Sequence, residues 1–403
     1  MKKLFCWLCL SAGLGAAERI DGLWDAVLTV NSYEVPFRIE FAQSGSELRG
    51  SFLDGDVKVS STSGQRDGDS VHLRFDFYNS QLRATLRDGR LEGAYVRRNK
   101  TGEQTYAFVA RRFVPAPAPP ASGPSIAGEW ILRTDVSGRP PIWRLLVRQS
   151  GAEVTGAILR LDGDTGTLSG TLRDGKLVMS HFSGARAARL EATLEPDGTL
   201  HGNLNRRVNF TGARVTEARA KGIPEPPDPS RFTSVRDPSE PFHFRFPDAD
   251  GRVISDADER FRGKVVIVNI MGSWCPNCHD ETPFLVELYR KYRGQGLEIV
   301  ALSFETFGDA PQDIAQIRAF ARRHGVSYPI LLAGMTEAGV VERTLPQIAN
   351  FDAYPTSFFL GRDGRVKSVH AGFASPATGA VHVELKREIE ALVARLLAEK
   401  PES

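Results

Sequence analysis

Cysteine is scarce in this sequence, and no long hydrophobic segment follows its first residues. Of the four cysteines among 403 residues, Cys6 and Cys9 lie near the N-terminus, and the others are Cys275 and Cys278. If the N-terminal segment with Cys6 and Cys9 is cleaved off, the remaining two cysteines are only three positions apart and cannot join distant parts of a fold, so structural disulfides are then excluded as the basis of its stability. The scarcity predicts that Cys275 and Cys278 have a chemical role.

An excess of charge is also missing. The chain has 51 Lys and Arg against 49 Asp and Glu, a formal net charge of +2. This balance excludes a strongly basic nucleic-acid surface or a polybasic membrane patch. The eight histidines are not clustered and there is no second cysteine pair, so we expect no zinc site and no other bound metal.

The N-terminus has the pattern of a secretion signal. Lys2 and Lys3 precede an apolar run over residues 4–14, and small residues follow up to Ala17. No later stretch approaches the ~18 apolar residues that a membrane-spanning helix needs. We predict a signal peptide over residues 1–17, cleaved after about Ala17, and an exported, periplasmic or extracytoplasmic protein. An uncleaved membrane anchor is the alternative, and a lipid-modified cysteine is disfavoured because bulky residues precede Cys6 and Cys9.

A repeat with a spacing of about 106 residues precedes the cysteine pair. Residues 20–24 (IDGLW) recur as 126–130 (IAGEW), and the QSG of residues 43–45 recurs with the same spacing. Both copies are rich in β-branched and aromatic residues, and both contain Asp-Gly pairs typical of tight turns. We predict two antiparallel β modules, residues 18–113 and 126–218, each a small barrel or sandwich.

Proline-rich segments separate the predicted parts. Residues 114–125 and 219–240 are predicted to be extended, semi-rigid linkers, and few contacts are expected across the second. In residues 241–403 strands and helices alternate, with apolar runs at 265–270 and 297–304 typical of buried strands. The predicted fold class is multidomain: two repeated antiparallel β modules followed by an α/β domain.

The cysteine pair lies where a buried strand gives way to a helix. Unpaired N–H groups and the helix dipole favour a thiolate at this position, which predicts Cys275 as the nucleophile. Cys278 follows one turn later and can resolve a mixed disulfide formed on Cys275. The predicted chemistry is dithiol–disulfide exchange, which needs no cofactor beyond the redox-active disulfide.

The segment around this pair resembles the thioredoxin superfamily, in its exported TlpA/ResA-like branch. Residues 265–283 (VVIVNIMGSWCPNCHDETP) carry the resemblance through Trp274 before the nucleophile, Pro283 within the helix and Glu281 after the second cysteine. The run Tyr354-Pro355-Thr356 is similar to the cis-proline segment that faces the two thiols. The resemblance covers about residues 240–400 and implies a thioredoxin-like α/β domain.

The resemblance also implies roles for particular residues. Glu281 is expected to assist proton transfer at Cys278, since Asn269 stands where cytoplasmic thioredoxins have a buried Asp. A substrate groove is expected from the following residues: Trp274, Pro276, Asn277, Tyr354, Pro355 and Thr356. Relatives of this branch imply protein thiols and disulfides as partners, action as a reductant, and a membrane electron donor. The direction stays open, and residues 371–379 match a pattern to which we assign no role.

Several alternatives accompany this prediction. Cys275-Pro-Asn-Cys278-His279 also spells the attachment motif for c-type haem, with His279 as axial ligand. A peroxidatic cysteine is disfavoured because the threonine expected three positions earlier is Gly272. The β repeats are either a binding module with an unknown ligand or a spacer and dimerisation surface.

Overall fold

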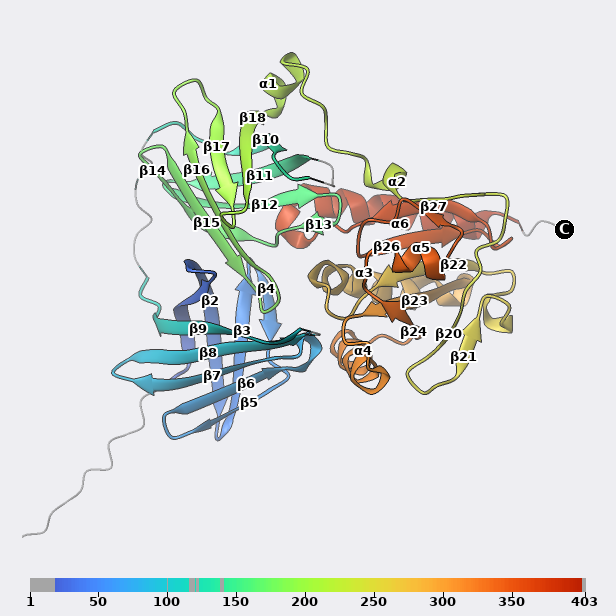
Figure 1. Ribbon diagram of the computed structural model, residues 1–403, viewed down its shortest axis with the longest axis horizontal. Helices are drawn as coiled ribbons and strands as arrows, with labels where there is room; N and C mark the ends of the chain where they lie inside the picture. The colour runs from blue at the N-terminus through green and yellow to red at the C-terminus, as the bar shows by residue number, and fades with distance from the viewer. Residues whose placement is uncertain (1–18, 100, 116–119, 121–122, 138–140, 401–403) are drawn as a thin grey trace, which may run out of the picture.

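The structure is a computed structural model that describes residues 19–99, 101–115, 120, 123–137 and 141–400. The predicted signal peptide, with Cys6 and Cys9, and part of the first predicted linker lie outside these residues. Within them, no helix combines the length and apolar character needed to cross a membrane. Figure 1 shows two β-barrels side by side and an α/β unit packed against both.

The first barrel is a closed antiparallel meander of eight strands, in which β9 pairs with β1 and β3 pairs with β2. Its strands are β1 (Gly22–Val30), β2 (Tyr33–Ser44), β3 (Glu47–Asp54), β5 (Ser63–Asp67), β6 (Ser70–Phe75), β7 (Ser80–Arg87), β8 (Arg90–Asn99) and β9 (Gly102–Arg112). A short β4 (Val57–Ser60) pairs with β3, and η1 (Asp76–Tyr78) follows β6. Eight strands leave an interior that side chains can fill. Trp24, Phe41, Phe52, Phe75 and Phe108 fill it, each under 2% exposed.

The second barrel repeats this architecture. Its strands are β10 (Gly128–Thr134), β11 (Ile142–Ser150), β12 (Glu153–Arg160), β14 (Leu168–Arg173), β15 (Lys176–Phe182), β16 (Ala187–Leu194), β17 (Leu200–Leu204) and β18 (Val208–Arg214), and β13 (Gly163–Asp164) pairs with β12. Trp24 Nε1 donates to the Ile20 carbonyl at 2.8 Å, and Trp130 Nε1 donates to the Ile126 carbonyl at 2.9 Å. The predicted fold class is confirmed, and both modules are barrels.

The α/β unit follows two short helices, α1 (Val215–Ala220) and α2 (Pro229–Phe232). Its strands are β19 (Ser234–Val235), β20 (Arg245–Pro247), β21 (Val253–Ser255), β22 (Val265–Met271), β23 (Leu297–Glu305), β24 (Ile330–Met335), β25 (Ile348–Ala349), β26 (Thr356–Leu360) and β27 (Val366–Ala371). Its helices are η2 (Glu259–Phe261), α3 (Pro276–Tyr292), η3 (Arg293–Gln295), α4 (Ala310–His324), α5 (Val340–Thr344), η4 (Pro376–Thr378) and α6 (Ala380–Ala398). The main sheet has the order β24-β23-β22-β26-β27, with β22 to β24 parallel and β26 and β27 antiparallel to their neighbours.

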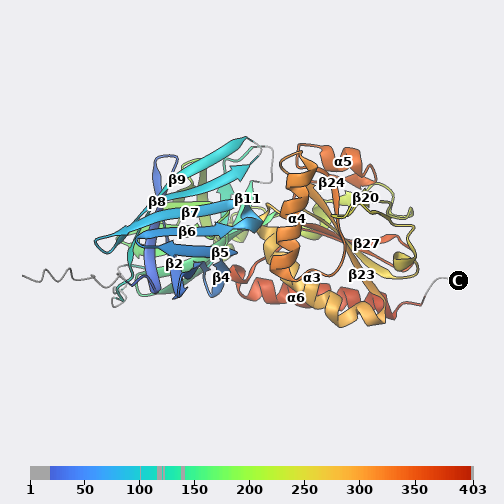
Figure 2. The same ribbon diagram turned by 90° about the horizontal axis from the view of Figure 1, so that it is seen from below.

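Both faces of this sheet are covered, which explains the continuous apolar strands. All seven residues of β22 are buried. Val265 and Ile267 pack with α3, α4 and α6 in one apolar cluster, and Figure 2 shows these three helices together. Val266 and Val268 pack in a second cluster with residues of η2, α5 and the segment before β20. The sheet therefore holds the end of β22, and the cysteine pair after it, on a rigid support.

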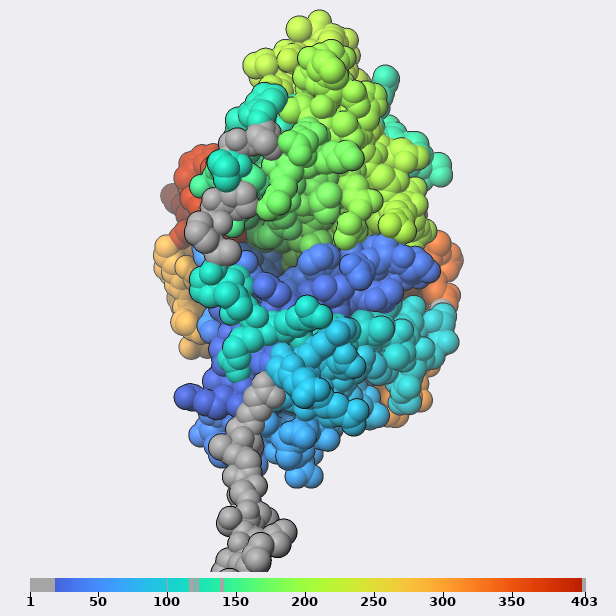
Figure 3. All heavy atoms as spheres, turned by 90° about the vertical axis from the view of Figure 1, so that its left-hand side faces the viewer, coloured from blue at the N-terminus to red at the C-terminus, as the bar shows by residue number. Residues whose placement is uncertain are grey.

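The two barrels and the α/β unit contact one another much more extensively than the proline-rich linkers between them predicted. Phe182 of the second barrel packs in the core of the first, 4.9 Å between ring centroids from Phe37. The first barrel places Phe77 and Tyr78 of η1 against α4 and the active-site helix. Figure 3 shows the two barrels in continuous contact. The expectation of few contacts across the second linker was wrong, because linker composition says nothing of the surfaces that the modules present to each other.

The second predicted linker also differs from a bare connector. β19 pairs with β25, and Thr233 is buried with its hydroxyl donating to the Asn350 carbonyl at 3.2 Å. Arg236 Nε donates to the Pro346 carbonyl at 2.9 Å. Residues 233–236 are thus part of the α/β unit, although their proline-rich surroundings predicted an extended linker.

Candidate functional site

Cys275 caps the N-terminus of α3, directly after the loop that leaves β22. The backbone N–H of Cys278 points at the Cys275 sulfur, with 3.3 Å between N and Sγ, and Pro276 occupies the first helical position. Both cysteines are free thiols and both are buried, Cys275 at 2% and Cys278 at 1% exposure. The helix N-terminus supplies N–H groups and a positive dipole to a thiolate on Cys275.

The Tyr354–Pro355 segment faces Cys275. Its peptide bond is cis, as predicted, and the Cys275 thiol lies 3.5 Å from the Tyr354 carbonyl oxygen. The Trp274 ring packs edge-on against the Tyr354 ring, with 5.4 Å between the ring centroids. The Trp274 indole N–H donates to the Phe304 carbonyl at 2.9 Å. Thr356 follows as a fully buried residue of β26. Trp274 and the Tyr354–Pro355 bond therefore lie beside Cys275, whereas the side chain of Thr356 is buried within β26.

Glu281 is buried beneath the cysteine pair, at 2% exposure. Its carboxylate accepts hydrogen bonds from Asn269 Nδ2 at 2.7 Å and Ser357 Oγ at 2.9 Å. Burial raises the pKa of Glu281 to about 7, against the effect of these two donors. The pKa of Cys278 is raised by burial, then by Cys275 and by the charge of Glu281. A buried carboxyl with a pKa near neutrality has the properties of a proton acceptor for a buried thiol.

Glu305 is a buried carboxyl beside the active-site segment that the sequence prediction missed. It is 1% exposed and accepts from the Ser273 backbone N–H at 2.9 Å and the Ser273 hydroxyl at 2.6 Å. Burial raises the pKa of Glu305, and the Ser273 hydrogen bonds oppose this. This carboxyl fixes the loop before Trp274, and its position at the end of a buried strand was the available signal.

His279 is held between α3, α4 and the first barrel. Its Nε2 lies 2.9 Å from the Ser273 carbonyl, so Nε2 carries the hydrogen and Nδ1 accepts from His324 Nε2 at 2.7 Å. The ring of Tyr78 packs against it at 4.6 Å. Burial, and then His324 and Arg323, hold the pKa of His279 well below its usual range. Both ring nitrogens are engaged, whereas the haem alternative needs one of them free.

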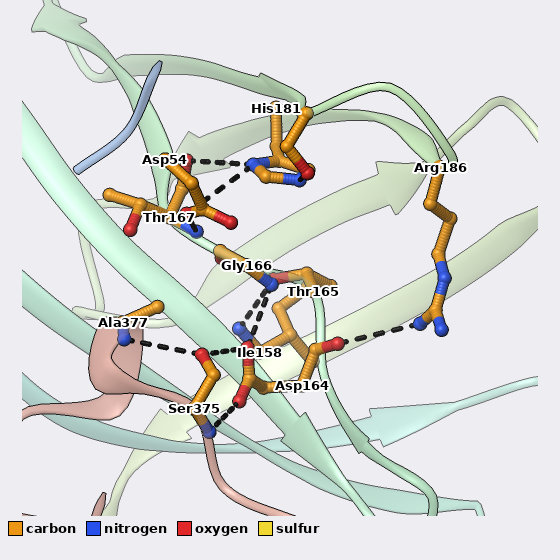
Figure 4. A network of polar contacts seen from close by, with 11 residues as sticks. Asp54, Ile158, Asp164, Thr165, Gly166, Thr167, His181, Arg186, Ser375 and Ala377 are labelled. Atoms are coloured by element: carbon orange, nitrogen blue, oxygen red, sulfur yellow. Dashed lines mark hydrogen bonds and ion pairs between the residues drawn. The ribbon is translucent and has the colours of Figure 1, made fainter. Parts of the chain in front are cut away.

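The second barrel contacts the first turn of α3 and the segment 371–379. Asn277 Nδ2 donates to the Asp162 carbonyl, and Asp164 accepts from the Ser375 backbone N–H at 2.6 Å and the Ser375 hydroxyl at 2.9 Å. Figure 4 shows Asp164 between Ser375 and Gly166, whose N–H donates to it at 2.7 Å. Segment 371–379, to which we assigned no role from the sequence, is therefore a contact surface for the barrel.

A cavity of about 500 Å³ lies where the three bodies meet, beside Pro276 and Asn277. Asp280 of α3 lines it, together with Asp54 of the first barrel and Arg186 of the second. Burial, followed by the charges of Asp164 and Asp54, raises the pKa of Asp280 well above its ordinary value. The active-site helix is thus surrounded by titratable groups from both barrels.

Fold and site together define a thioredoxin-like domain with a reduced cysteine pair. The Redoxin family matches residues 235–382. The chain is 32% identical over 143 residues to "Thiol-disulfide oxidoreductase ResA" of Geobacillus thermodenitrificans, covering 33% of this chain and 72% of that protein. It is also 32% identical over 124 residues to the protein of that name from Bacillus thuringiensis subsp. konkukian, covering 31% of this chain.

A solved structure from Chlorobium tepidum, a thiol:disulfide interchange protein of the thioredoxin family, is 23% identical with a TM-score of 0.31. It covers 41% of this chain and 100% of its own. The chain spans 63% of the length of the Bacillus thuringiensis relative. The chain belongs to the ResA-like family of redoxin-domain proteins.

Proposed function

We propose that the chain is an exported thiol-disulfide oxidoreductase that reduces disulfides in protein partners. The observation that carries the proposal is the placement of Cys275 as the cap of α3, with the Cys278 N–H at 3.3 Å from its sulfur and the cis Tyr354–Pro355 bond opposite. The names of the ResA relatives support the reaction type. The predicted signal peptide supports export.

The reaction proceeds in two exchanges. The Cys275 thiolate attacks one sulfur of a substrate disulfide, whose other sulfur leaves as a thiolate, and a mixed disulfide forms. Glu281 takes the Cys278 proton, and the Cys278 thiolate attacks the Cys275 sulfur and releases the second substrate thiol. Two electrons pass to the substrate and a Cys275–Cys278 disulfide remains. A dithiol donor, proposed to be a membrane protein, then reduces this disulfide.

The roles of the two cysteines can be tested with a peptide disulfide and the reduced full-length chain. Cys278→Ser should accumulate a covalent adduct on Cys275, because no resolving thiol remains. Cys275→Ser should form no adduct at a comparable rate. An equally fast adduct on Cys278 would refute the assignment.

The direction follows from the reduction potential of the pair, measured against glutathione or dithiothreitol. A value near or below about −270 mV, as in thioredoxin, supports a reductant. A value near about −120 mV, as in strong oxidants, would contradict the proposed direction.

A further inference from the structure

Residues 161–164, which comprise the turn after β12 and the short strand β13, pack against Asn277 of α3 and against residues 372–375; we call them the covering turn. A Cβ atom added at Gly163 would lie 2.3 Å from Asn277 Nδ2 and 2.8 Å from the Phe373 carbonyl oxygen. A Cβ atom added at Gly372 would lie 2.3 Å from the Leu161 carbonyl oxygen. The two backbones approach this closely because glycine stands on both sides of the contact.

The covering turn is fastened by hydrogen bonds to a buried carboxylate. Asp164 is 1% exposed and accepts from both the N–H and the hydroxyl of Ser375. Asn277, between the two cysteines, donates to the Asp162 carbonyl. Hydrogen bonds to a charged acceptor are stronger than neutral ones. The covering turn therefore makes a specific contact with the first turn of α3.

The contact reaches the wall on which a substrate strand is expected. The covering turn approaches Gly372, and the Gly372 N–H donates to the carbonyl of the cis-proline Pro355 at 2.7 Å. On the other side of Cys275, Arg97 of the first barrel donates from Nη2 to the Trp274 carbonyl at 3.5 Å. Its Nη1 donates to the Ala185 carbonyl of the second barrel at 2.7 Å. Barrel residues thus contact the residues on both sides of Cys275.

We propose that the covering turn is a built-in occupant of the substrate groove and gates access of polypeptide substrates to Cys275. An extended substrate pairs with the backbone beside Pro355, and the covering turn stands against that wall. A substrate therefore has to displace the turn before the sulfurs meet. This inference rests on the proposed function.

The connection between the second barrel and the α/β unit permits such a displacement. Residues 221–228 contain no helix or strand, so the barrel edge can separate from the 372–375 loop without breaking regular structure. Local openings of this kind occur at free energies well below that of global unfolding. Small reagents need less opening than a peptide, which gives the gate a size-dependent signature.

The first test traps a substrate and observes the turn. In full-length Cys278→Ser protein, Cys275 attacks the cysteine of a short peptide activated with thionitrobenzoate, and the released chromophore counts the peptide disulfides formed. Hydrogen exchange of residues 158–166 should then become at least about tenfold faster than in protein carrying only a methylthio group on Cys275, because the peptide holds the turn open. Unchanged exchange in a fully formed peptide adduct would overturn the gate while the proposed function stands. Failure of Cys275 to react with either reagent would refute the proposed function, and the gate with it.

The second test loosens the gate. Asp164→Asn replaces one carboxylate oxygen by an amide N–H₂, so either the Ser375 N–H or the Gly166 N–H loses its acceptor. The peptide reaction should become about tenfold faster, which equals about 1.4 kcal/mol, and the reaction with methyl methanethiosulfonate should change much less. Asp56→Asn, in the exposed β3–β4 turn of the first barrel, is the matched control and should leave both rates unchanged. Equal acceleration of both reagents by Asp164→Asn would contradict a gate. The trapped-peptide experiment tests the unaltered turn if this variant folds poorly.

Discussion

Replacing Glu281 by Gln tests the proposed proton acceptor and the energetics of its burial together. Gln can accept from Asn269 and donate to Ser357, so the buried hydrogen bonds are kept while the charge is removed. The pKa of Glu281 rises from 4.5 to about 7 on burial. The folded protein therefore holds a proton that the unfolded chain has released. This corresponds to roughly 3 kcal/mol of stability, present below about pH 4.5 and lost as the pH rises through 7.

The Gln variant lacks this loss because it is neutral at every pH. Its free energy of unfolding in urea, relative to the parent, should rise by roughly 3 kcal/mol between about pH 4.5 and pH 8. Conversely, resolution of a mixed disulfide at pH 7, followed by stopped-flow release of the substrate thiol, should slow about a hundredfold. The inflection near pH 7 in the parent's rate should disappear.

Glu287→Gln on the same helix is the control, since the Glu287 side chain is 67% exposed. It should leave both the stability difference and the rate unchanged. Identical rates for parent and Glu281→Gln across about pH 6–9 would refute the proton-transfer role. A difference in free energy of unfolding between Glu281→Gln and the parent that stays constant between about pH 4.5 and pH 8 would refute the argument from buried charge.

Two further predictions concern the contacts between the barrels and the α/β unit. Burial, and then the charge of Arg323, lower the pKa of His324 to about 3. The neutral imidazole therefore contributes fully to the stability of the folded protein above about pH 6.5. Below that pH the contribution falls by about 1.4 kcal/mol per pH unit as the pH drops towards 3. His324→Gln should remove this loss. In urea unfolding, the free energy of unfolding of the parent minus that of the variant should be smaller at pH 5.5 than at pH 7.5, and an equal difference at the two pH values would contradict the prediction. Phe182→Ala should destabilise the chain by about 3–5 kcal/mol, because the ring fills the junction of the barrels against Phe37 and Phe52. A change below about 1 kcal/mol in urea unfolding would show that the barrels do not depend on this contact.

The local features of the active-site segment were predictable because each follows from neighbouring residues. The apolar run before Cys275 predicted a buried strand, and the structure has β22 there. The Tyr354-Pro355-Thr356 pattern predicted a cis-proline, which the structure contains. The prediction placed Glu281 near Cys278 through the family resemblance. Its burial and its partner Ser357 came only from the structure, because Ser357 is on a strand far along the chain.

The surroundings of the site depended on contacts that leave little trace in sequence. Asp164 and Ser375 are far apart in the chain, and although Ser375 lies in the pattern of residues 371–379, nothing in the sequence pairs that pattern with Asp164. His279 suggested a haem ligand in isolation, whereas the folded protein pairs it with His324. Sequence periodicity shows which side of a helix or strand is apolar, but not which barrel or domain packs against that side.

The sequence by itself determined the units: two β modules from a repeat and its turns, and a redox domain from a cysteine pair between a strand and a helix. These features are encoded locally, through turn residues, the alternation of side chains and the cap of a helix. Only the tertiary structure decided that the modules close into barrels and that both barrels contact the active-site segment. Barrel closure and packing between the bodies depend on surfaces assembled from many distant strands, where no single residue is decisive. The contacts of Trp274 and Asn277, on either side of Cys275, are therefore a property of the assembled chain rather than of the residues around the cysteine alone.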